Sequence, residues 1–208
     1  MRPGSPVEDR DGAALARAVR ALRDGAVIVY PTETFYGLGV DFSVPGALEL
    51  LFAIKAREPD KPIALIAADA AMAFSVAHEV PPAARLLAER FWPGPLTLVL
   101  PAHPGLPAGL VGTEGGVGVR VSPHRVARAL VSSLGHPITA TSANLAGAPP
   151  SRTIIEARAA FGERVAVYLD GGTMDADAPS TVVGFDGSKI RIIRAGAIGE
   201  SRLRENLK

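Results

Sequence analysis

The stretch AVIVYPTETFYGLG, residues 26–39, begins with five β-prone apolar residues and then turns polar. Pro31 ends the apolar run, so we expect a buried strand at residues 26–30. The loop that follows supplies hydroxyls, a carboxylate and two glycines, which suits it to hold a small polar ligand. The same residues could instead close a turn, with the threonines bonding to backbone and the glycines satisfying local geometry.

Helical and β-prone segments alternate on both sides of this stretch. Before it, residues 11–24 place apolar side chains on one helical face and meet Gly25. After it, Ser43 is the predicted N-cap of a helix that has Pro45 in its first turn and reaches Lys55. Further helices are expected at residues 69–77, 82–91, 123–133 and 153–161, and further strands at 62–67, 96–100, 117–121, 138–141, 165–169, 181–185 and 189–194.

Asp186-Gly187 separates the last two predicted strands and is typical of a hairpin, which requires antiparallel pairing. The alternation elsewhere favours an α/β layer fold. No repeat or linker divides the sequence. We therefore predict a single-domain α/β fold over residues 1–208, with its core at about 11–198 and a twisted mixed sheet flanked by helices.

The composition excludes several classes of chemistry. Cysteine is absent, which removes disulfides, thiolate nucleophiles and cysteine-ligated metals. The four histidines lack metal-ligand spacing, so no metal site made of protein side chains is predicted. The N-terminal segment has no signal-peptide apolar run, and no stretch approaches the ~18 apolar residues of a membrane span. We predict a cytoplasmic protein that does not enter membranes, and its net charge of +1 leaves the partner open.

Three cations, Lys55, Arg57 and Lys61, follow one another at the end of a predicted helix. Cations there complement the helix dipole without any ligand. They could also clamp a phosphate, with Arg57 as a bidentate fork. Neither a G-x-x-x-x-G-K-[ST] phosphate loop nor a G-x-G-x-x-G dinucleotide loop occurs in the chain.

Other polar residues stand where predicted strands end. Ser142 and Asn144 follow the strand at residues 138–141, and ligands of open α/β sheets collect at the carboxyl ends of strands. A serine or asparagine turn would explain the two residues equally well. Arg120 lies inside an apolar strand and Arg194 ends the last one, so each needs an anion from the protein or from a ligand.

Seven motifs, in this order and spacing, resemble the YrdC-like threonylcarbamoyl-AMP synthase family. They are YPTETFYGLG, KAREPDKPI, FWPGPLTLVL, VGVRV, TSANLAG, PSTVV and IIRAGAI. The resemblance covers residues 25–198 and implies a YrdC-like fold with a basic concave ligand-binding surface. It also implies that L-threonine, bicarbonate and ATP are joined into threonylcarbamoyl-AMP with release of pyrophosphate, for threonylcarbamoyladenosine modification of tRNA.

The resemblance assigns roles to individual residues. Those implied for the ATP phosphates and the adenylate are Lys55, Arg57, Ser142, Asn144 and Arg194, with Lys55 and Arg57 as the catalytic pair. Those implied for threonine are Thr32, Lys61, Arg120 and Ser180. Mg²⁺ is expected on the triphosphate, and tRNA or tRNA-modification proteins are possible partners.

Three features depart from the family pattern: Glu58 and Pro179 replace the residues common there, and one extra residue lies between Gly147 and Thr153. Two alternatives therefore stay open. One is a related enzyme that acts on another carbamoyl-adenylate. The other is a non-catalytic module that binds RNA through its basic face.

Overall fold

A computed structural model describes residues 6–58, 61–187 and 189–207. Among them, nine strands form one sheet: β1 (Ile28–Tyr30), β2 (Gly37–Gly39), β3 (Ala64–Ala67), β4 (Leu96–Pro101), β5 (Gly116–Val121), β6 (Ile138–Ser142), β7 (Val167–Tyr168), β8 (Thr181–Asp186) and β9 (Lys189–Arg194). Their order across the sheet is β7-β1-β2-β6-β3-β5-β4-β8-β9. The N-terminal segment used to predict a cytoplasmic location lies partly outside the described residues.

The sheet is mixed, as predicted. Three neighbouring pairs run parallel: β1 with β7, β3 with β5, and β4 with β8. The remaining five pairs are antiparallel, including the predicted closing hairpin, in which Asp186 pairs with Lys189. Gly187 takes the left-handed backbone conformation at that turn, with a φ of 57°.

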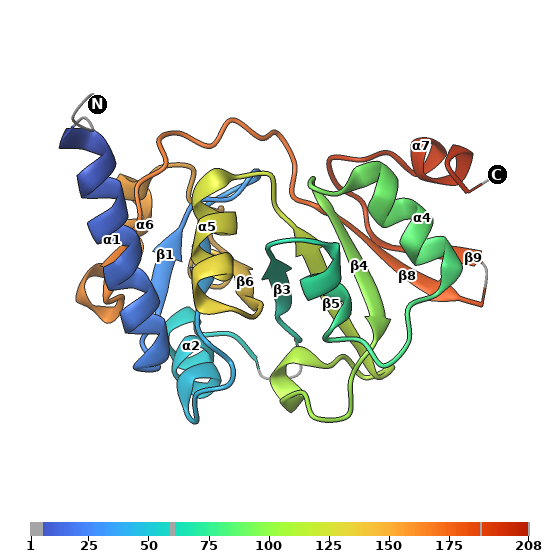
Figure 1. The fold of residues 1–208 in the computed structure, drawn as a ribbon, viewed down its shortest axis with the longest axis horizontal. Coiled ribbons are helices and arrows are strands. Elements are labelled where there is room, and N and C mark those ends of the chain that lie inside the picture. The colour runs from blue at the N-terminus through green and yellow to red at the C-terminus, as the bar shows by residue number, and fades with distance from the viewer. Residues whose placement is uncertain (1–5, 59–60, 188, 208) are drawn as a thin grey trace, which may run out of the picture.

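Helices connect the strands (Figure 1). They are α1 (Pro6–Arg23), α2 (Ala47–Lys55), α3 (Ala70–Phe74), α4 (Pro82–Phe91), α5 (Arg125–Leu134), α6 (Ile154–Phe161) and α7 (Glu200–Glu205), with two 3₁₀ turns at Ala108–Leu110 and Gly162–Arg164. Each predicted helix is present. None of the helices within the described ranges is long and apolar enough to cross a membrane.

The predicted start of α2 is wrong. Ser43 does not cap the helix, because its backbone N–H and its hydroxyl both donate to Asp41 Oδ1, at 2.9 and 2.6 Å. Gly46 is the N-cap instead, in a left-handed conformation, and the helix begins at Ala47. Pro45 therefore lies before the first turn. By contrast, Thr153 and the Glu156 carboxylate form a full capping box on α6.

Two apolar clusters hold the layers together. Alternate residues of β1 enter different clusters: Ile28 and Tyr30 join one, and Val29 joins the other. The first cluster is completed by α1 and α5, which lie side by side over this part of the sheet (Figure 1). The second includes residues of α2, α4 and α6. Burial of both clusters fixes the strand ends that carry the site.

Strand β2 was not predicted, and Tyr30 explains why its sequence is rich in glycine. The Tyr30 hydroxyl donates to the Thr139 carbonyl at 2.9 Å, so the ring of β1 reaches across β2 to β6. A Cβ on Gly39 would lie 2.7 Å from the ring atom Cε1 of Tyr30, and one on Gly37 would lie 3.3 Å from the ring. These glycines therefore make room for a buried tyrosine, as the local-geometry alternative predicts, and Gly37 also lines the cavity described below.

Replacing Gly39 with alanine is expected to destabilise the protein by about 1–3 kcal/mol, because the added methyl group overlaps the Tyr30 ring. Urea denaturation followed by circular dichroism measures the change. Gly199→Ala is the matched control, since its Cβ would meet nothing within 4 Å. Equal stability of the two variants would show that the Tyr30 ring moves aside freely.

Candidate functional site

A cavity of about 1150 Å³ opens on the sheet, between the loop after β1 and the strands β4, β5, β6, β8 and β9. Six of the nine residues predicted for the site line it: Thr32, Arg57, Arg120, Ser142, Ser180 and Arg194. They come from six separate segments of the chain. The structure thus brings these residues to one cavity, and their individual roles remain predictions.

Four of the residues that line this cavity are arginines, namely Arg57, Arg120, Arg191 and Arg194, and Arg191 is paired with Glu114. Arg57 is held at the end of α2, where its Nε donates to the Lys61 carbonyl at 2.9 Å and its Nη2 to the Pro62 carbonyl at 3.0 Å. Burial lowers the pKa of Arg194, and the positive charges of Arg120 and Arg57 lower it further. Mutual repulsion of this kind means that the guanidinium groups share one region, where an anion is favoured.

Lys55 is buried beside the cavity and does not line it. Its Nζ donates to the Ser142 carbonyl at 2.5 Å and to the Asn144 carbonyl and Oδ1, each at 3.0 Å. Burial, aided by the charge of Arg57, lowers the pKa of Lys55 to about 8. The ammonium group has three hydrogens, so these contacts use all of them and join α2 to the loop after β6.

Asn144 shapes that loop. Its Oδ1 also accepts from the Ser142 hydroxyl at 2.6 Å, and its Nδ2 donates to the carbonyls of Leu145 and Ala148, at 3.0 and 2.6 Å. The side-chain amide is therefore used within the loop, as the turn alternative predicts. Of the two residues, only Ser142 faces the cavity.

Lys61 lies outside the cavity lining, on the exposed loop after α2. Its Nζ is 2.5 Å from Glu58 Oε2, one of the positions that depart from the family pattern. A hydrogen bond from Lys61 lowers the pKa of the Glu58 carboxyl group. Because both side chains are exposed, the pair contributes little stability and can open to a ligand.

Hydroxyl groups line the part of the cavity between Thr32 and Ser180. Thr32 Oγ1 donates to the Phe35 carbonyl at 2.6 Å, which is the turn geometry that the sequence left open. Ser180 Oγ lies 3.0 Å from Thr97 Oγ1 and accepts from Arg194 Nη2, also at 3.0 Å. Thr97, which also lines the cavity, was not predicted. The one feature of the sequence that indicates it is a hydroxyl residue within the apolar strand β4, and this hydroxyl group is buried.

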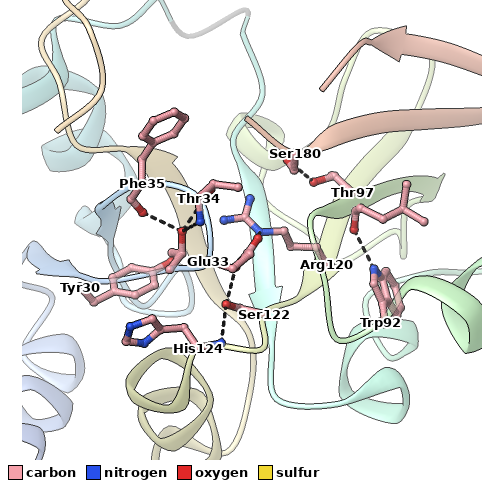
Figure 2. Close-up of polar contacts among 12 residues, drawn as sticks. Tyr30, Glu33, Thr34, Phe35, Trp92, Thr97, Arg120, Ser122, His124 and Ser180 are labelled. Atoms are coloured by element: carbon pink, nitrogen blue, oxygen red, sulfur yellow. Dashed lines mark hydrogen bonds and ion pairs between the residues drawn. The ribbon is translucent and has the colours of Figure 1, made fainter. Parts of the chain in front are cut away.

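Arg120 is paired with an acidic residue of the chain. This is one of the two alternatives left open above, in which the anion comes from the protein or from a ligand. Its Nε lies 3.0 Å from Glu33 Oε1, and the two side chains are only 10% and 9% exposed. Figure 2 shows Glu33 between Arg120 and Ser122, whose hydroxyl also contacts the carboxylate. Glu33 was not predicted, because nothing in the sequence indicates which of many acidic residues meets Arg120.

Protein ligands for a metal ion do not gather at this cavity. Within the part of the chain that the structure describes, no three His, Asp or Glu side chains lie close enough together to hold an ion. The carboxylate beside Arg120, Glu33, is committed to Arg120 and Ser122, and Glu114 is paired with Arg191. The donor set thus does not fit a metal held by protein side chains, and a magnesium ion would depend on phosphate oxygens.

Known proteins are similar to this chain in sequence and in fold. The Sua5/YciO/YrdC family model, which carries the description "Telomere recombination", matches residues 20–196. The threonylcarbamoyl-AMP synthase of Thiobacillus denitrificans is 40% identical over 186 residues, which cover 89% of this chain and 98% of that protein.

Solved structures agree with the sequence match. The structure of P. abyssi Sua5 complexed with L-threonine superposes with a TM-score of 0.88 at 31% identity, covering 94% of this chain and 57% of that longer one. E. coli YciO gives a TM-score of 0.79 at 26% identity, covering 91% of each chain. The motifs, the sheet and these matches agree, and the chain belongs to the Sua5/YciO/YrdC family.

Proposed function

We propose that this chain is a threonylcarbamoyl-AMP synthase, which makes threonylcarbamoyl-AMP and pyrophosphate from L-threonine, bicarbonate and ATP. The observation that carries the proposal is the convergence of Arg57, Arg120 and Arg194 on one cavity that Ser142 and Ser180 also line. Relatives that match nearly their full length, such as the Thiobacillus denitrificans protein, carry this name. The product serves threonylcarbamoyladenosine modification of tRNA.

The chemistry requires a carbamate formed from threonine and bicarbonate, whose oxygen attacks the α-phosphorus of ATP while pyrophosphate leaves. Negative charge builds on phosphoryl oxygens, so cations that are already in position stabilise the transition state. Arg57, Arg194 and Ser142 fit this role, since they line the cavity and are held by hydrogen bonds to neighbouring groups. No protein nucleophile is needed.

Threonine is assigned to the side of the cavity that holds Thr32, Arg120 and Ser180. A guanidinium group binds a carboxylate through paired N–H donors, and hydroxyl groups suit the substrate's own hydroxyl and amine. Lys61, on the neighbouring exposed loop, could approach only if its contact with Glu58 opens. The L-threonine complex of P. abyssi Sua5 supports an amino-acid site in this fold.

Lys55 fits a positioning role better than direct contact with phosphate. Its three hydrogen bonds go to Ser142 and Asn144, so it fixes the loop from which the Ser142 side chain faces the cavity. Arg57 then carries the charge stabilisation that the family resemblance implied for both residues. Mg²⁺ on the triphosphate, contact with tRNA or tRNA-modification proteins and a cytoplasmic location remain predictions.

Pyrophosphate release tests the proposed function. The purified protein is mixed with ATP, Mg²⁺, bicarbonate and one amino acid at a time, and pyrophosphate is measured with a coupled assay. We expect release with L-threonine that requires bicarbonate. Release with a different carbamoyl donor would indicate a related enzyme, and salt-sensitive RNA binding without any release would indicate a binding module; either result would contradict the proposal.

A further inference from the structure

The Arg120 side chain has two unlike edges. Its Nε faces Glu33 Oε1 at 3.0 Å, inside the protein. Neither of its Nη nitrogens makes a hydrogen bond to another described residue, and Arg120 lines the cavity. In Figure 2 the guanidinium group extends from β5 past the Glu33 carboxylate toward Thr34. The edge that carries the Nη nitrogens is thus available to a ligand.

Glu33 is itself held in place through its second oxygen. The Ser122 hydroxyl contacts Glu33 Oε2, and the same hydroxyl oxygen accepts from the His124 backbone N–H at 3.2 Å. A hydroxyl group has one hydrogen, so with its oxygen accepting from His124 it donates that hydrogen to Glu33. The carboxylate therefore accepts from Ser122 on one oxygen and faces Arg120 with the other.

This chain of contacts ends on a rigid element. His124 is the N-cap of α5, and its Nδ1 accepts from the Val126 N–H at 3.3 Å. Burial lowers the pKa of His124, which favours the neutral ring that this contact requires. Ser122 directly follows β5, the strand that carries Arg120. The position of Glu33 is therefore set by the junction of a strand and a helix.

The charge balance of Arg120 differs from that of Arg194. The buried carboxylate of Glu33 compensates the Arg120 charge. Among the described residues, Arg194 donates only to the neutral oxygens of Ser180, at 2.8 to 3.2 Å. A guanidinium group whose charge is balanced by a carboxylate still donates two hydrogen bonds, but the pair adds little net positive potential to the cavity. Such a group suits a monoanionic carboxylate, while an uncompensated one attracts polyanionic phosphate.

We propose that Glu33 is a positioning residue that directs the Nη edge of Arg120 into the cavity and reserves it for the substrate carboxylate by repelling phosphate. The inference rests on the proposed function, because the carboxylate is that of threonine. Without Glu33, Arg120 becomes a third strongly cationic group of the cavity, and phosphate competes with threonine there.

The test compares Glu33→Gln with the unmodified protein by isothermal titration calorimetry. L-threonine is titrated in the absence and presence of inorganic phosphate, without ATP. The variant is expected to bind threonine at least about 10-fold more weakly, because the ion pair that positions Arg120 is lost, and to gain phosphate binding that competes with threonine. Glu163→Gln, a change in an exposed carboxylate of the second 3₁₀ turn, is the matched control.

A second variant separates positioning from charge. Ser122→Ala removes the hydrogen bond to Glu33 and keeps the carboxylate. It should weaken threonine binding by a smaller factor, about 3-fold, without introducing phosphate competition. If Glu33→Gln does not fold, threonine and phosphate binding can still be measured with Ser122→Ala. Phosphate competition in that variant would then overturn the proposal, because the carboxylate is still present.

The outcomes of the Glu33→Gln titrations are decisive. Unchanged threonine affinity, or weaker binding without phosphate competition, would overturn the proposed role of Glu33. If the unmodified protein binds no threonine, the proposed function fails instead. The phosphate titration then still decides on Glu33, because a gain of phosphate binding in the variant does not depend on the identity of the substrate.

Discussion

Replacing Lys55 with alanine is expected to lower threonine-dependent pyrophosphate release by about 100-fold or more, because about 3 kcal/mol of loop positioning is lost. The change removes the donor that the Ser142 and Asn144 carbonyls share, so the loop after β6 is no longer tied to α2. The protein should remain folded. Burial of the ammonium group is itself unfavourable, as its lowered pKa of about 8 indicates. Removing the group therefore recovers part of the stability that its hydrogen bonds contribute.

Two further variants make the Lys55 prediction specific. Lys55→Met keeps most of the side-chain volume without a donor and should behave like the alanine variant, since the hydrogen bonds are what matter. Lys189→Ala, which removes an exposed lysine of β9, should leave turnover unchanged. The variants are compared by pyrophosphate release and by circular dichroism. Normal turnover in a folded Lys55→Ala protein would exclude Lys55 from the site.

Replacing Arg194 with methionine is expected to raise the KM for ATP by about 10- to 100-fold, the loss of one charged hydrogen bond of about 1.5–3 kcal/mol. Its guanidinium group lies close to the charges of Arg120 and Arg57 and lines the cavity, and no acidic residue within the described ranges pairs with it. Initial rates at varied ATP give the KM. A thermal-shift experiment should show that ATP stabilises the variant less than the unmodified protein.

Arg128→Met is the control for Arg194, because Arg128 is exposed on α5, outside the cavity lining. It should bind ATP as the unmodified protein does. If Arg194→Met also retained the original KM and the full stabilisation by ATP, the nucleotide would have to bind away from the end of β9.

Much of the fold follows from the sequence because burial is periodic. The helix that ends just before Gly25 and the apolar run before Pro31 alternate as an α/β layer fold requires, and each predicted strand and helix is present. Strand β2 escaped prediction, since its glycines serve the ring of Tyr30 from a neighbouring strand. Ser43 was misassigned because a bond to Asp41 competes with helix capping.

The site was predicted only in part, for a physical reason. The family motifs identified residues such as Arg57, Ser142 and Arg194, which meet at one cavity. They did not show that the Lys55 ammonium group binds the loop after β6, because this depends on the path of that loop. Nor did they reveal Glu33, whose contact Ser122 lies 89 residues away in sequence. Such partners are selected by tertiary packing.

The most direct test of the account is a structure of the protein determined with a non-hydrolysable ATP analogue and L-threonine. We expect phosphate oxygens within hydrogen-bonding distance of Arg57, Arg194 and Ser142, and the threonine carboxylate against the Nη nitrogens of Arg120. Phosphates bound elsewhere, or an amino acid that does not contact Arg120, would contradict the account.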